Sequence, residues 1–150
     1  MLPSELGAAG SAKAVREFTK WVAEYRAGAE ILHGYGTDEL TSLPALPLAA
    51  WRTQLAALDT VAQSTHRQGF AALGMAERQG LIRQALEGRR VTAMPGVSAA
   101  PHIAVALLSH FYDSADATDL CYGVQIGAKQ CRPLVHNSRQ PLPLARGGRA

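Results

Sequence analysis

Apolar residues recur at three- and four-residue steps in four segments of this chain, which is the spacing of one face of an α-helix. The pattern predicts helices over residues 11–32, 47–65, 75–86 and 98–112. No stretch alternates apolar and polar residues for long enough to predict a strand. Residues 33–47, rich in glycine, proline and threonine, are expected to form a loop. The pattern therefore favours an all-α fold.

Beyond residue 112 the helical spacing weakens. Ser114 is expected to cap one further short turn through Ala117–Leu120. The residues after it combine both cysteines with three prolines and four arginines and follow neither a helical nor a strand period. About thirty residues of this kind are uncommon inside a compact domain. We therefore expect a single domain: a small bundle of about four helices over residues 1–112 and an extended, non-regular arm over 113–150 that lies along a partner protein.

The arm and the end of the last helix hold tyrosine and arginine, which are enriched at interface centres because they combine contact area with directed hydrogen bonds. Leucines nearby would serve as apolar anchors. The expected partner-binding residues are Phe111, Tyr112, Cys121, Tyr122, Arg132, Leu134, His136, Asn137, Arg139 and Leu142. The alternative interpretation is a solvated, partly ordered terminus.

Cys121 and Cys131 are ten residues apart, and the absence of a CxxC pair excludes a zinc ribbon or a thioredoxin-like motif. In an oxidising compartment a disulfide between them would close a small loop, with a stabilisation of about 2–4 kcal/mol. One of them could instead bridge to a partner chain. In a cytosol both would be free thiols. The sequence leaves these three states open.

A metal site is one alternative to the partner-binding interpretation. His110 and Asp113 are three residues apart and are therefore neighbours on a helix surface. His102 lies roughly 16 Å away along the helix axis, too far to share one ion. A His–carboxylate pair binds zinc or iron when a third ligand comes from elsewhere, which would make the chain a small metal-dependent helical enzyme. We favour the simpler interpretation, in which the histidines bond to neighbours or to a partner.

The charge and the absence of known motifs exclude several kinds of function. Charged residues make up 18% of the chain, against about 25% in an average domain, which fits a large core or a surface covered by a partner. The net charge of +3 is spread along the chain rather than gathered on one helix, so nucleic-acid binding is not expected.

No apolar run is long enough to predict a transmembrane helix. No GxGxxG or Walker-type motif is present, so we expect no cofactor bound by this chain alone.

Three segments in order give the chain a resemblance to a known family. They are the Leu2–Pro3 start with the lead GAAGSAKAVREF, the pair WRTQLAALDTVAQ and GFAALGMAERQGLIRQAL, and the segment HIAVALLSHFYDSADATDLCYG before a basic, proline-rich tail. In this order they resemble the small (gamma) subunit family of gluconate 2-dehydrogenase, also called subunit 3. The resemblance covers most of residues 1–145.

The resemblance implies a non-catalytic subunit of a heterodimer. Members of this family pair with a large FAD-dependent flavoprotein of the glucose-methanol-choline type, which oxidises a sugar, a sugar acid or a polyol. Electrons then pass to a cytochrome c subunit or another acceptor. The small subunit is implied to act as a chaperone for the flavoprotein and often to supply the twin-arginine signal for its export. No such signal precedes Leu2, so we expect a periplasmic protein if an export signal has been removed and a cytoplasmic one otherwise.

Overall fold

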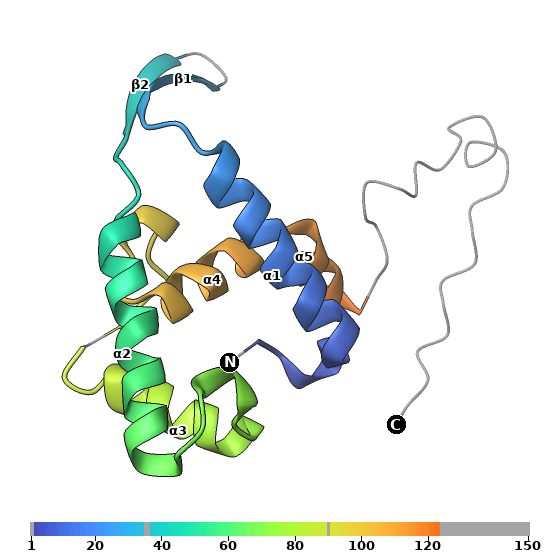
Figure 1. Cartoon of the computed structure of the whole chain (residues 1–150). Helices are drawn as coiled ribbons and strands as arrows, with labels where there is room; N and C mark the ends of the chain where they lie inside the picture. Colours follow the sequence, from blue (N-terminus) through green and yellow to red (C-terminus); the bar gives the residue numbers. More distant parts are fainter. Residues whose placement is uncertain (1, 35–36, 90, 124–150) are drawn as a thin grey trace, which may run out of the picture. The chain divides into compact units, whose positions relative to one another are not determined.

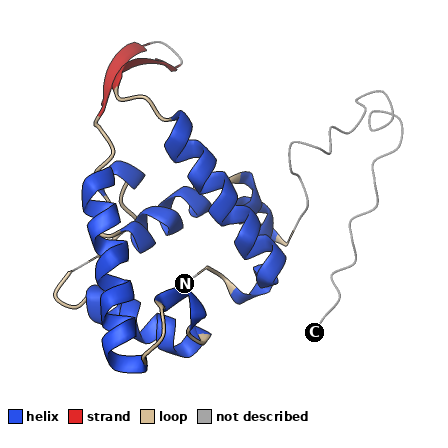
Figure 2. Ribbon diagram, viewed as in Figure 1, coloured by secondary structure: helices blue, strands red, loops and turns tan. Residues whose placement is uncertain are grey.

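The computed structural model describes residues 2–34, 37–89 and 91–123 (Figure 1). These residues form five α-helices and one two-stranded antiparallel hairpin, drawn in blue and red in Figure 2. The helices are α1 (Gly7–Glu24), α2 (Leu48–His66), α3 (Met75–Ala85), α4 (Ile103–Tyr112) and α5 (Ala115–Tyr122), and the strands are β1 (Gly28–Gly34) and β2 (Thr37–Leu43). The all-α fold expected from the sequence is confirmed. The chain divides into two units, residues 1–113 and 114–150, and of the second the structure describes residues 114–123.

Helix α1 begins earlier than predicted. A 3₁₀ turn at Ser4–Leu6 leads into the helix at Gly7, four residues before Ser11, which was expected to start it. Gly7 has a φ of +60°, a left-handed conformation that glycine adopts without a steric penalty. The alanines that follow are strong helix formers and carry the helix into its apolar face.

The prediction of helix up to Leu32 followed by loop was wrong. Tyr25 is extended, with φ −60° and ψ 134°, and this ends α1 at Glu24. Strands β1 and β2 then pair antiparallel, in register from Gly28 opposite Leu43 to Gly34 opposite Thr37. The phenolic O–H of Tyr25 donates a hydrogen bond to the carbonyl of Pro44 at 2.7 Å. This hydrogen bond therefore holds together the two ends of the hairpin segment, where it follows α1 and where it leads into α2.

Two clusters of buried apolar side chains form the core of the first unit. The first cluster is Phe18, Trp51, Val97, Ala100, Val105 and Ala106. The second cluster is Leu58, Ala62, Leu73 and Leu81. Helix α2 contributes to both, and it contacts α3 and α4, while α1 contacts α4. Burial of each large side chain in these clusters contributes about 1.5–3 kcal/mol.

Helix α4 begins later than Ser98, the predicted start. Residues Val97–Ala99 form a 3₁₀ turn, and Ala100 is extended because the ring of the following Pro101 excludes the helical region for the residue before it. The helix therefore starts only at Ile103. His102, expected within the helix, occupies its N-cap position instead.

In the second unit, the predicted cap at Ser114 is confirmed. Its side-chain oxygen accepts a hydrogen bond from the backbone N–H of Ala117 at 3.2 Å. The turn it starts is longer than expected, because α5 continues to Tyr122 and ends at Gly123, which has a φ of +62°. The segment expected to be non-regular from residue 113 onward therefore begins with a helix. Residues 124–150 lie outside the part of the chain that the structure describes.

Candidate functional site

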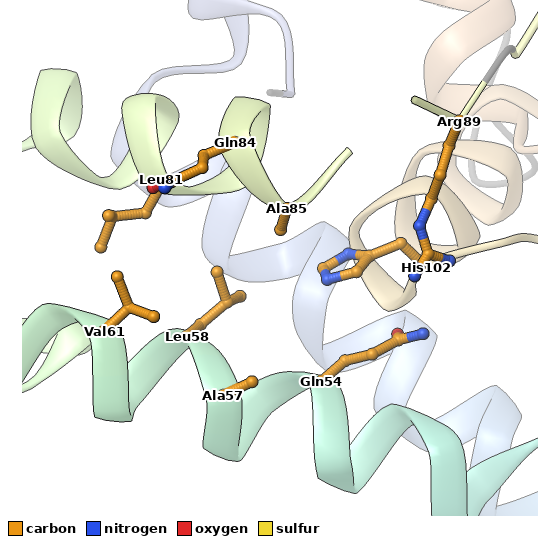
Figure 3. A pocket seen from close by; sticks show the side chains of 9 residues that line it. All are labelled: Gln54, Ala57, Leu58, Val61, Leu81, Gln84, Ala85, Arg89 and His102. Atoms are coloured by element: carbon orange, nitrogen blue, oxygen red, sulfur yellow. The ribbon is translucent and has the colours of Figure 1, made fainter. Parts of the chain in front are cut away.

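A cavity of about 330 Å³ lies between α2 and α3 and is closed at one end by the segment that enters α4 (Figure 3). Its apolar wall consists of Ala57, Leu58, Val61, Leu81 and Ala85. Four polar side chains complete the lining, those of Gln54, Gln84, Arg89 and His102. A mostly apolar cavity with a few polar groups is the usual form of a small-molecule site.

Gln54 fixes the polar end of the cavity. Its side-chain nitrogen donates to the carbonyl of Pro101 at 3.1 Å, and its side-chain oxygen accepts from the backbone N–H of Ile103 at 2.8 Å. These two bonds join α2 to a segment almost fifty residues later in the sequence. They also satisfy one of the free amides in the first turn of α4.

His102 lines the cavity although only 2% of its surface is exposed. Its Nδ1 accepts a hydrogen bond from the backbone N–H of Ala104 at 3.1 Å, which caps α4. An accepting Nδ1 is unprotonated, so the neutral ring carries its proton on Nε2. Burial lowers the pKa of His102 below 6.5, and the positive charge of Arg89 lowers this pKa further. His102 is therefore a neutral donor at the wall of the cavity.

Arg89 brings a positive charge to the same end. One of its guanidinium nitrogens donates to the carbonyl of Pro101, and Figure 3 shows its side chain descending toward His102. Among the described residues, no carboxylate lies within ion-pair distance of this guanidinium. Its remaining N–H groups are available to an acceptor from outside.

A larger, mostly apolar groove of about 680 Å³ lies between the N-terminal segment, α3 and α4. Its apolar lining is Leu2, Pro3, Ala8, Phe70, Met75, Ile82, Ala104, Leu107 and Leu108. The side chain of Met75 is 69% exposed. Arg78 also lines the groove, and within the described part of the chain no acidic side chain pairs with it.

The residues expected to bind a partner divide into three groups. Phe111 is buried, with 3% of its surface exposed, so it packs within the chain and offers little area to another protein. Tyr112, Cys121 and Tyr122 are exposed, Tyr122 to 77%. The others lie outside the described residues: Arg132, Leu134, His136, Asn137, Arg139 and Leu142. Cys131 lies there too, so the pairing of Cys121 stays a prediction.

His110 belongs to an aromatic cluster. Its ring lies 5.5 Å from that of Phe18 and 5.4 Å from that of Trp21, measured between ring centroids. Burial lowers the pKa of His110, while Glu17 and Asp113 oppose this shift. In residues 2–34, 37–89 and 91–123 no group of three histidine, cysteine or acidic side chains is placed to hold a metal ion. No observation therefore favours the metal-dependent alternative built on His110 and Asp113.

The sequence pattern did not indicate the cavity residues Gln54 and Arg89. Both sit beside helical faces whose spacing indicates burial, but a single glutamine or arginine carries no motif. Pro101 could have indicated them. A proline that breaks a helical pattern leaves backbone groups that need hydrogen-bond partners from another element, and Gln54 and Arg89 both donate to the carbonyl of Pro101.

No helix in the described part of the chain is long and apolar enough to cross a membrane. Comparisons with models of protein families, with curated proteins and with solved structures found no match to this chain.

Proposed function

We propose that this chain is the non-catalytic small subunit of an FAD-dependent dehydrogenase that oxidises a sugar, a sugar acid or a polyol. Its role is to stabilise and mature the large flavoprotein subunit, which holds the FAD and passes electrons to a cytochrome c or another acceptor. The resemblance of three ordered segments to the small subunits of gluconate 2-dehydrogenase suggested this role. The structural observation that carries it is the open apolar groove between the N-terminal segment, α3 and α4.

The groove has the character of an interface. Its lining is mostly apolar, and Met75 within it is exposed. Met75 at its edge is flexible and polarisable, which suits packing against a shaped partner surface. Arg78 places a positive charge beside this apolar lining that no acidic side chain of the described residues pairs with, so we expect an acidic side chain of the flavoprotein to meet it.

Two exposed tyrosines, one in each unit, are further candidates for contact with the flavoprotein. Tyr112 ends α4 and Tyr122 ends α5, and both offer amphipathic rings of the kind that interface centres favour. The residues from 124 onward remain part of this proposal through the sequence pattern alone. In the exported form of the complex the pair would reach the periplasm together, and otherwise it would stay in the cytoplasm.

Co-expression with a large flavoprotein of the glucose-methanol-choline type from the same genome tests the proposal. An affinity tag on this chain is expected to recover a yellow complex with one flavoprotein. Met75→Glu places a charge in the groove and is expected to reduce recovery of the flavoprotein by about tenfold or more. Leu40→Glu is the matched control, because Leu40 is 70% exposed on β2 and lies outside the groove.

Charge reversal gives a second pair of variants. Arg78→Glu is expected to weaken pairing, whereas Arg83→Glu, an exposed position on the same helix outside the groove, is expected to leave it unchanged. Recovery of this chain without flavoprotein, or equal recovery with the groove variants and their controls, would contradict the proposal.

A further inference from the structure

We propose that the cavity between α2 and α3 is a binding site for a small monocarboxylate with an apolar body, such as a single ring or a short alkyl chain. This inference does not depend on the proposed pairing, because the cavity and the groove have no lining residue in common.

The distribution of polar groups in the cavity points to an amphipathic ligand. Figure 3 shows Gln54, Arg89 and His102 at one end and Val61 and Leu81 at the other. A molecule with one polar end and one apolar end would match both. The volume of about 330 Å³ is near the lower limit of ligand pockets, which span about 300–1,000 Å³, so a compact ligand fits best.

The polar end selects an anion. Arg89 brings a permanent charge that no carboxylate of the described residues neutralises. His102 adds a neutral donor, because its Nδ1 is occupied by Ala104 and its Nε2 carries the proton. Within the described part of the chain no group bonds to this Nε2, and this nitrogen is not among the fully buried polar atoms without a partner, so it faces open space at the cavity wall. Two donors and one positive charge suit a carboxylate better than a neutral or cationic group.

The apolar end is already shaped by the fold. Leu58 and Leu81 belong to the second core cluster and are held by it. Gln54 is locked by its two bonds to the chain at Pro101 and Ile103, so the polar end is also fixed before any ligand arrives. Such preorganisation reduces the entropy cost of binding.

The test titrates the full-length chain with three compounds of one shape and different charge: phenylacetate, phenylacetamide and phenethylamine. Nuclear magnetic resonance and calorimetry are expected to show phenylacetate binding about tenfold or more tighter than phenylacetamide, since hydrogen bonds to a charged acceptor are the stronger ones. Phenethylamine is expected not to bind. The backbone amide shifts caused by phenylacetate should centre on Leu58, Leu81, Ala85 and Ile103.

Two variants with matched controls locate the site. Ala57→Trp fills the cavity and is expected to abolish binding, whereas Ala56→Trp, on the neighbouring exposed position of α2, is expected to retain it. Arg89→Gln is expected to weaken the binding of phenylacetate about tenfold or more without changing the affinity for phenylacetamide. Arg83→Gln is expected to change neither affinity.

Amide shifts centred outside the cavity, or phenethylamine binding as tightly as phenylacetate, would overturn the inference. Should a variant fail to fold, the shift map of the unmodified chain decides the question alone.

Discussion

Replacing Gln54 with leucine is expected to destabilise the first unit by about 2–3 kcal/mol. The side chain makes two hydrogen bonds, at 3.1 Å to the Pro101 carbonyl and at 2.8 Å to the Ile103 N–H. Each contributes about 0.5–1.5 kcal/mol net, and a partly buried amide left without a partner costs about 1–3 kcal/mol. The Pro101 carbonyl keeps its bond from Arg89, so the Ile103 amide accounts for most of the loss.

Urea unfolding of the full chain measures this loss. Far-ultraviolet circular dichroism follows the helices, and tryptophan fluorescence follows Trp51 in the first core cluster and Trp21 beside it. The midpoint is expected to fall while the m value stays constant. Gln63→Leu is the control, because Gln63 is exposed on the same helix and surface substitutions usually change stability by less than about 0.5 kcal/mol. A Gln54→Leu protein as stable as this control would refute the reasoning that the two bonds hold α4 to α2.

Three further predictions follow from other contacts. Because the folded pKa of His102 lies below its unfolded value of 6.5, its contribution to stability is complete above pH 6.5 and is lost as the pH falls. His102→Asn keeps a capping side chain, so the urea midpoint of this variant should depend less on pH below pH 6.5 than that of the unmodified chain. An equal pH dependence of the two midpoints would contradict this. Tyr25→Phe removes the bond to Pro44 and should cost about 1 kcal/mol in the same assay, whereas no change would mean the hairpin ends are held otherwise. Deleting residues 121–150 should abolish recovery of the flavoprotein, and retained pairing of the truncated chain would refute the prediction that these residues are required.

Helical spacing predicted much of the fold because burial follows it. Trp51, Leu58 and Ala62 fall on one face of α2, and all three are buried. Leu55 follows the same three- and four-residue spacing between Trp51 and Leu58, yet it is 49% exposed. Spacing therefore identifies the side of a helix that turns toward other elements but not how much of that side they cover.

The hairpin shows where spacing fails. Residues 28–43 have no alternation that would predict a strand, and their pairing depends on hydrogen bonds between backbone groups, which every residue type except proline can both donate and accept. The cavity was beyond prediction for a different reason. Gln54 and His102 are far apart in the sequence, and both line the cavity because Gln54 bonds to the residues on either side of His102, Pro101 and Ile103. A contact between residues so distant in the sequence leaves no local pattern in either segment.

The bond between Tyr25 and Pro44 has an evolutionary consequence. Since the two ends of the intervening stretch are held side by side, insertions or deletions there would leave the positions of α1 and α2 unaltered. Descendants of the same ancestral gene should therefore differ in length between these two residues more often than within the helices, and a foreign peptide grafted at this place should be tolerated.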